Sequence, residues 1–212
     1  MAKVYPFSIG VFSGTLGDVV YATWKGIPYI RSKPAFVVNP RTEAQQSQRA
    51  KFTLAIRFLK SFADFIRMGY KKYAIKKTAF NAAMSYTLGN AIVGNYPDYR
   101  IDYSRVLVSR GALTSAVNVQ AGIEGGAVRI SWNDNSTLGF AKSTDNALAI
   151  VINPDKVEAV YKTAGAPRGS GMETLDIPTG WTGDQVEVYL GFISDNGKEV
   201  SNSVYAGSLI IP

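Results

Sequence analysis

The side chains that could do covalent chemistry in this protein are few, because the chain contains no histidine and no cysteine. Histidine is the commonest general base and metal ligand, and the cysteine thiolate is a strong nucleophile. Ser-His-Asp, Cys-His and histidine–zinc sites are therefore excluded within this sequence, which leaves carboxylates, lysines, tyrosines and hydroxyl groups. This set favours a protein that is not an enzyme, with no catalytic residue, no metal site and no cofactor.

The remaining acid–base candidates are carboxylates, which do hydrolytic chemistry when two of them face one cleft. Asp98 and Asp102 are four residues apart in a strand-like segment, so they would share one face. Arg100 and Arg105 lie close to them in the sequence, and ordinary ion pairs are the simpler interpretation. Three further aspartates fall in turn-like segments, where aspartate is common: Asp134, Asp145 and Asp155.

A second candidate for chemistry is the series Gly10, Gly14 and Gly17, because glycine-rich loops can hold phosphate groups. Such loops follow a strand, begin a helix and often carry a Gly-Lys-Ser or Gly-Lys-Thr sequence. Here the glycines precede a strand-like segment, and no such sequence follows them. We interpret them as residues of turns, a bulge or a close backbone approach.

The elements that would position any site begin with an extended N-terminal region, residues 1–40. Residues 18–24 are rich in Val, Tyr, Thr and Trp, which suit a strand, and Lys25-Gly26 suits a two-residue turn. Residues 27–31 are expected to pair back as a hairpin, and Pro28, which lacks an N–H, predicts that the strand is a sheet edge at that position. We interpret the hairpin as a docking edge. Its expected interface residues are Trp24, Lys25, Tyr29, Arg31 and Lys33.

Charge divides the chain into two halves. Residues 1–110 hold 17 Lys and Arg against 5 Asp and Glu, a net of +12, and residues 111–212 hold 6 against 11, a net of −5. The basic half could face nucleic acid or the acidic half of another copy, or both halves could be ordinary solvated surfaces. The densest basic run is a connector that either contacts phosphates or is a solvated loop. Its candidate nucleic-acid contacts are Lys71, Lys72, Tyr73, Lys76 and Lys77.

Helical periodicity covers the middle of the basic half. Thr42 is an expected N-cap, and apolar residues recur at spacings of three and four up to Tyr70. This pattern predicts one helix of about 28 residues, about 42 Å long. Thr78 is expected to cap a second helix that ends near Val93, and residues 99–108 are strand-like.

After residue 111 the pattern is entirely β, so we expect two domains: a basic hairpin-and-helix module over residues 1–111 and a second domain over residues 112–212. Seven short strand-like segments separated by turn signals are typical of an immunoglobulin-like or fibronectin-III-like β-sandwich, and the fold class is therefore α+β. The absence of a cysteine pair excludes an antibody-type domain. The expected strands are 116–123, 127–132, 147–153, 158–163, 172–177, 185–194 and 203–211, with Trp132, Trp181 and Tyr189 as core anchors.

No run of about 20 apolar residues is present, and the N-terminal residues lack the apolar stretch of a secretory signal peptide. We therefore expect a protein without membrane insertion, located in the cytoplasm or associated with a virion.

Several motifs resemble a known family. The pattern GxxGxVVYxxWKGxPYxRxxP covers residues 14–34, and further matching segments lie at residues 42–52, 80–86 and 96–111. Together they resemble a family of uncharacterised Bacteroidota proteins, classed as a domain of unknown function. N-terminal segments of this type are also similar to small proteins of phage and prophage from the same bacteria. The resemblance implies a Bacteroidota origin, and it implies no activity, substrate or catalytic residue.

These observations support three hypotheses about function. The first is a non-enzymatic structural protein that self-associates as a homo-oligomer or docks into a larger particle, phage-like or at a cell surface. The second is a nucleic-acid-binding protein that uses the basic half. The third is a surface module whose sandwich binds a protein or a glycan.

Overall fold

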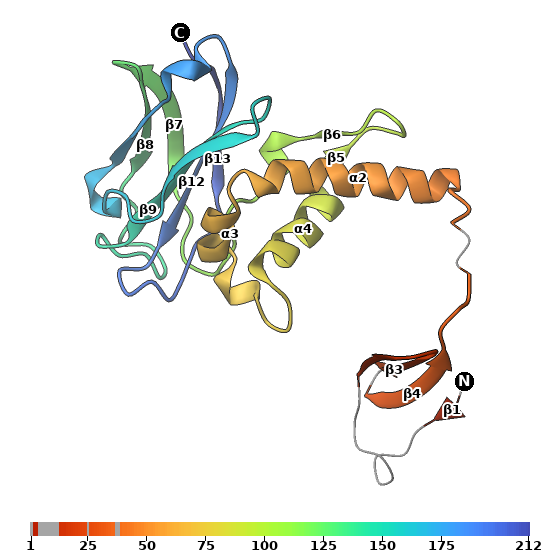
Figure 1. The fold of residues 1–212 in the computed structure, drawn as a ribbon. Coiled ribbons are helices and arrows are strands. Elements are labelled where there is room, and N and C mark those ends of the chain that lie inside the picture. The colour runs from red at the N-terminus through yellow and green to blue at the C-terminus, as the bar shows by residue number, and fades with distance from the viewer. Residues whose placement is uncertain (1, 4–12, 25, 37–38) are drawn as a thin grey trace. The chain divides into compact units, whose positions relative to one another are not determined.

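A computed structural model describes residues 2–3, 13–24, 26–36 and 39–212 (Figure 1). The chain forms two compact units, Met1–Thr42 and Glu43–Pro212. This division differs from the one expected at residues 111 and 112, because the helices of the basic half share a hydrophobic core with strands of the acidic half.

The N-terminal unit is an antiparallel sheet of four strands: β1 (Ala2–Lys3), β2 (Gly14–Leu16), β3 (Val19–Trp24) and β4 (Ile27–Ser32). The expected hairpin is confirmed, with Val19 opposite Ser32 and Trp24 opposite Ile27. The strand order is β1-β4-β3-β2, so β4 as a whole is an inner strand, whereas the prediction placed a sheet edge at Pro28. The described pairing of β4 with β1 covers Tyr29 and Ile30. It thus leaves out Pro28, which has no N–H to donate.

The expected long helix is two helices, α2 (Glu43–Lys60) and α3 (Ala63–Gly69). The break lies at Ser61 and Phe62. The Ser61 hydroxyl donates to the carbonyl of Phe58 at 2.8 Å, and Phe62 has non-helical backbone angles of −135° and 38°. Serine hydroxyls compete with backbone N–H groups for helical carbonyls in this way. The helix is therefore broken here, although the apolar stripe in the sequence continues across the break.

The second helix, α4 (Ala79–Asn90), has the expected N-cap, because the N–H of Asn81 donates to the Thr78 hydroxyl at 3.1 Å. A short helical turn, η1 (Lys71–Tyr73), precedes it. The strand expected over residues 99–108 was wrong. Within this segment only β6 (Arg100–Ile101) is a paired strand, and its partner is β5 (Ile92–Val93). Asp102 then caps the turn η2 (Tyr103–Arg105) by accepting from the Ser104 N–H.

The seven expected C-terminal strands are present, each within one residue of its expected bounds at either end. They form two antiparallel sheets, in the orders β10-β9-β12-β13 and β11-β8-β7. Short turns η3 (Arg168–Ser170) and η4 (Thr179–Trp181) flank β11. The strands are β7 (Val117–Glu124), β8 (Ala127–Asn133), β9 (Asn146–Asn153), β10 (Glu158–Lys162), β11 (Met172–Asp176), β12 (Gln185–Ile193) and β13 (Val204–Ile210). The fold is α+β.

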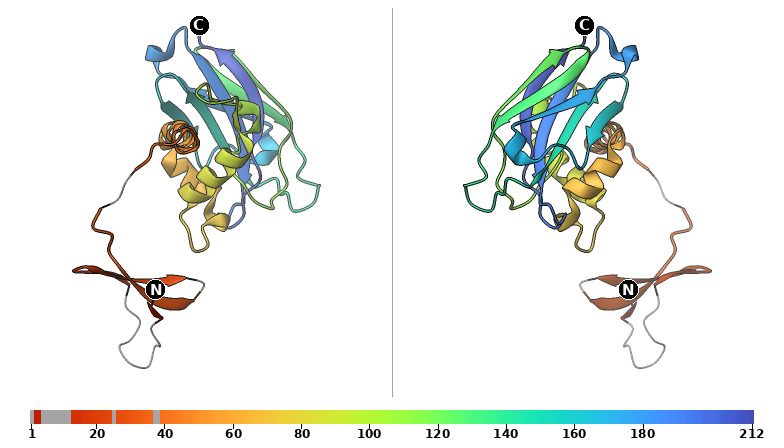
Figure 2. Two further views of the ribbon diagram at one scale, coloured as in Figure 1. Left: turned by 90° about the vertical axis from the view of Figure 1, so that its right-hand side faces the viewer. Right: turned by 90° about the vertical axis from the view of Figure 1, so that its left-hand side faces the viewer.

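The unit Glu43–Pro212 has three layers, with the β10-β9-β12-β13 sheet in the middle (Figure 2). The helices cover one face of this sheet and the β11-β8-β7 sheet covers the other. Strand β9 is buried on both faces, which explains the unbroken apolar run at residues 147–152. Side chains of β9 alternate between two cores: Leu148, Ile150 and Ile152 pack with the helices, and Ala147, Ala149 and Val151 pack between the sheets.

The three expected core anchors are all buried, but they do not share one core. Trp132 and Trp181 lie between the two sheets. Tyr189 faces the helices instead, and its hydroxyl donates to the carbonyl of Tyr103 at 2.8 Å. Tyr189 therefore links the helical layer to the central sheet.

Candidate functional site

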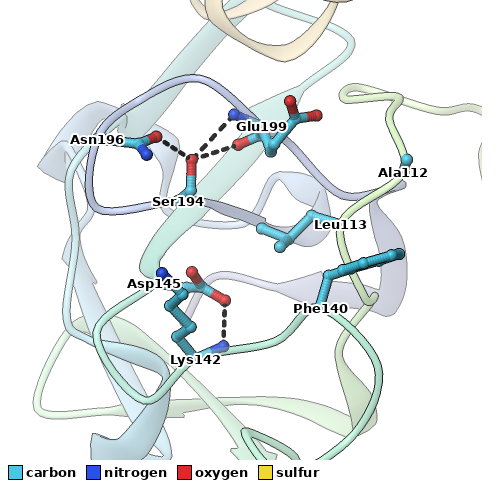
Figure 3. Close-up of a pocket in the computed structure, with 8 residues that line it drawn as sticks. All are labelled: Ala112, Leu113, Phe140, Lys142, Asp145, Ser194, Asn196 and Glu199. Atoms are coloured by element: carbon cyan, nitrogen blue, oxygen red, sulfur yellow. Dashed lines mark hydrogen bonds between the residues drawn. The ribbon is translucent and has the colours of Figure 1, made fainter.

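Three loops at one end of the sheets enclose a pocket of about 420 Å³ (Figure 3). They precede β7, precede β9 and join β12 to β13. Of the pocket's two large apolar residues, Leu113 is buried and Phe140 is 78% exposed. The lining residues are Ala112, Leu113, Phe140, Lys142, Asp145, Ser194, Asn196 and Glu199.

A buried ion pair holds the pocket wall in place. The Arg168 Nε donates to Asp145 Oδ2 at 3.2 Å, and the two side chains are 0% and 1% exposed. The other guanidinium nitrogens donate to Asn135 Oδ1 at 2.6 Å and to the Thr114 carbonyl at 2.9 Å. The guanidinium carbon also lies 3.7 Å from the centre of the Phe192 ring. Burial lowers the pKa of Arg168, and Asp145 opposes that shift by stabilising the charged form.

The Asp145 carboxylate is only partly satisfied. Its Oδ2 accepts from Arg168 and from the backbone N–H of Lys142 at 2.8 Å. Its Oδ1 is buried and accepts no hydrogen bond. A buried acceptor without a hydrogen bond costs free energy. Asp145 is therefore the residue of this pocket that a hydrogen-bond donor on a ligand would satisfy.

On the opposite wall the polar groups are engaged in a turn. The Ser194 hydroxyl donates to Asn196 Oδ1 and accepts from the Glu199 N–H, both at 2.9 Å. The Glu199 carboxylate pairs with Lys72 at 2.5 Å. The loop between β12 and β13 is therefore a preformed wall.

A second, more polar pocket of about 340 Å³ lies where η2 meets β12 and β13. Its buried Glu187 accepts from the Tyr205 hydroxyl at 2.5 Å and from Gln185 and Ser208 at 3.0 and 3.2 Å. Burial raises the pKa of Tyr205, and Glu187 raises it further. Because neutral donors satisfy Glu187, this pocket is a weaker ligand site than the first.

The structure brings most of the expected interface residues onto one face of the N-terminal sheet. Partners across antiparallel strands share a face, and alternate residues of a strand share it too. The register pairs Trp24 with Ile27 and Ala22 with Tyr29, so these residues lie on one side. We call this side the Trp24 face and define it by Val20, Ala22, Trp24, Ile27, Tyr29 and Arg31.

Trp24 is 63% exposed and Ile27 is 48% exposed, while Tyr29 is half-buried. Lys33 follows β4, and its backbone N–H donates to the Asp18 carbonyl at 2.7 Å. Lys25 lies outside the described residues.

The basic connector is less available to a phosphate backbone than its sequence indicated. Lys71 donates to the Gly197 carbonyl, and Lys72 forms the ion pair with Glu199. Tyr73 packs on Tyr70, and the Arg110 guanidinium carbon lies 4.4 Å from the centre of the Tyr73 ring. The other two expected contacts, Lys76 and Lys77, are exposed.

Sequence reasoning did not find Asp145, Arg168 and Phe140 as site residues. Asp145 and Arg168 both lie in segments rich in turn residues, where aspartate and arginine are common at the surface. No pattern in the sequence pairs two such positions 23 residues apart. Nothing in the sequence around Phe140 indicated a binding site, because single exposed aromatic residues are common on protein surfaces.

A comparison with protein families identifies the family of this chain. The family described as "Family of unknown function (DUF6266)" matches residues 11–207. The chain belongs to this family. No curated protein and no solved structure gives a significant match.

Within the part of the chain that the structure describes, none of the helices combines the length and apolar character needed to cross a bilayer. The same part of the chain holds no group of three or more acidic residues placed to hold a metal ion.

Proposed function

We propose that this member of the DUF6266 family is a non-enzymatic assembly protein that associates with further copies of itself through the Trp24 face. The same docking would attach it to a larger particle, phage-like or at a cell surface. The resemblance of its N-terminal segment to small phage and prophage proteins of Bacteroidota is the reason for naming such a particle.

The observation that carries the proposal is that the described residues of the N-terminal sheet do not enclose a core. Within residues 13–24 and 26–36, every side chain is exposed or half-buried. On the Trp24 face, Trp24 and Ile27 are 63% and 48% exposed. Leu16, on the opposite face, and Phe36, beyond β4, are 72% and 82% exposed. A small sheet needs an apolar face that is covered, and large exposed apolar groups mark interaction surfaces. A second copy of the chain would supply a protein surface that covers this apolar face.

Charge supports the choice of a second copy as the partner. The half of the chain that contains the Trp24 face has a net charge of +12, and residues 111–212 have a net charge of −5. Opposite charges steer association and are screened by salt. Self-association through this face would therefore weaken as salt is added.

We also infer that residues 112–212 form a fibronectin-III-like sandwich. The chain passes from the β11-β8-β7 sheet to the other sheet after β8, returns to it for β11 and crosses again to β12. Such exchange between two antiparallel sheets is the Greek-key connectivity of immunoglobulin-like folds. A sandwich of this kind is a rigid fold, which docking through the N-terminal sheet would bring into the assembly.

Analytical ultracentrifugation of the full chain tests the assembly proposal. We expect a concentration-dependent oligomer that dissociates with added salt. Replacing Ile27→Ser removes an apolar side chain from the Trp24 face, and it should raise the dissociation constant about tenfold or more. The matched control is Ile75→Ser, at an isoleucine that is 75% exposed in the other unit.

Two results would overturn the proposal. One is a protein that stays monomeric at every concentration and salt condition. The other is an oligomer that Ile75→Ser weakens as much as Ile27→Ser does, because the interface would then not be specific to the Trp24 face.

A further inference from the structure

We propose that the pocket lined by Phe140 and Asp145 is a saccharide-binding site that holds one pyranose unit of a glycan. This is a function separate from assembly, because all the lining residues belong to the unit Glu43–Pro212. The argument rests on three properties of the pocket: an exposed aromatic ring, an unsatisfied buried acceptor, and donors on the rim.

The first property is the exposed ring. Phe140 is 78% exposed, although large apolar side chains gain by leaving water. A pyranose ring presents an apolar C–H face that can cover such a ring. Leu113 extends the apolar surface inward, and Figure 3 shows it between Phe140 and the Asp145 carboxylate. A ligand stacked on Phe140 would therefore reach toward the carboxylate.

The second property is the Asp145 carboxylate oxygen Oδ1, which is buried and accepts no hydrogen bond. The ion pair with Arg168 fixes the position of this oxygen. Oδ1 is shielded from solvent in this structure, so the pocket lining must shift before a sugar hydroxyl can donate to it. The hydroxyl-to-carboxylate hydrogen bond formed in this way is among the stronger ones. A wholly apolar ligand would leave Oδ1 unsatisfied.

The third property is the presence of donors on the rim. The Lys142 ammonium and the Asn196 amide nitrogen can donate to the same ligand, since both residues line the pocket. Hydroxyl groups donate and accept, so neighbouring hydroxyls on one ring can serve Asp145 and these donors together.

The charges of the pocket favour a neutral ligand over an ion. Arg168 already neutralises Asp145, and Lys72 already neutralises Glu199. A cationic ligand would meet Lys142, and an anionic ligand would meet the two carboxylates. A neutral polyhydroxy ring avoids both costs while using the acceptor and the donors.

The test is saturation-transfer difference NMR on the full chain, with the methyl pyranosides of glucose, galactose, mannose and N-acetylglucosamine as probes. We expect transfer to the ring C–H protons of at least one probe. Phe140→Ala should weaken binding about tenfold, since it removes the stacking surface, whereas Phe140→Tyr should retain it.

Two further variants sharpen the result. Ala112→Trp places a bulky side chain at an exposed position of the lining and should block the pocket. Phe36→Ala is the matched control, because Phe36 is 82% exposed and belongs to the other unit. Neither Phe140→Ala nor Ala112→Trp touches the ion pair of Asp145 and Arg168, so both should fold.

The proposal is overturned if none of the probes receives saturation from the wild-type chain. It is also overturned if transfer survives undiminished in both Phe140→Ala and Ala112→Trp, or if Phe36→Ala removes it as well. Loss in the two pocket variants, with retention in Phe36→Ala and Phe140→Tyr, supports it.

Discussion

Replacing Arg168→Met should destabilise the protein by about 3–5 kcal/mol, because it leaves the buried Asp145 carboxylate without its cation. The two side chains are 0% and 1% exposed, so water cannot take the place of the lost partner. The substitution also removes the donors to Asn135 Oδ1 and the Thr114 carbonyl. Against a total stability of about 5–15 kcal/mol for a typical domain, the loss is large.

The measurement is equilibrium unfolding in urea, followed by tryptophan fluorescence. Trp132 is a suitable reporter, since its indole donates to the Arg168 carbonyl at 2.8 Å. The matched control is Arg129→Met. Arg129 pairs with Glu124 at 2.8 Å, but these side chains are 43% and 67% exposed. An exposed pair of this kind contributes about 0–1 kcal/mol.

A double-mutant cycle with Asp145→Asn separates the ion pair from the rest of the network. We expect the double variant to be less destabilised than the sum of the single variants, because each single variant leaves one buried group without its partner. The reasoning is refuted if Arg168→Met costs no more than Arg129→Met. Equal costs would mean that burial of the pair has no energetic consequence.

Two other predictions concern stability. Burial tends to raise the pKa of Glu173, but hydrogen bonds from Lys162 and two backbone N–H groups outweigh burial and hold this pKa below its ordinary value. The resulting stabilisation is present above the unfolded pKa of about 4.3 and is lost as pH falls through the lower folded pKa. The urea midpoint of Glu173→Gln should therefore fall less on acidification than the midpoint of the wild type. An equal dependence of the two midpoints on pH contradicts this. Gly69→Ala should lower the thermal midpoint, since a Cβ there would lie 2.6 Å from the Val108 carbonyl oxygen. Gly89→Ala, in open space within α4, should raise it by removing a flexible residue from a helix, and calorimetry that ranks the two variants in the opposite order would refute the packing argument.

Local sequence patterns were enough to predict the strands. The seven C-terminal strands and the hairpin of β3 and β4 follow from β-branched and aromatic runs bounded by turn residues, which act over a few residues. The same applies to the Thr78 cap of α4, because a hydroxyl reaches only the N–H groups of its own turn. The exclusion of histidine and cysteine chemistry needed only the composition.

Contacts between distant segments decided the rest. Which face of each element meets a neighbour determines three features of the fold. These are the placement of β4 inside its sheet, the joint core of helices and strands, and the direction of Tyr189 toward the helices. The ion pair of Asp145 and Arg168 has the same origin. Two turn-like positions 23 residues apart become one buried network only when the loop before β9 packs against the turn η3. Sequence periodicity records how a segment divides between apolar and polar faces, and it does not record which segments meet.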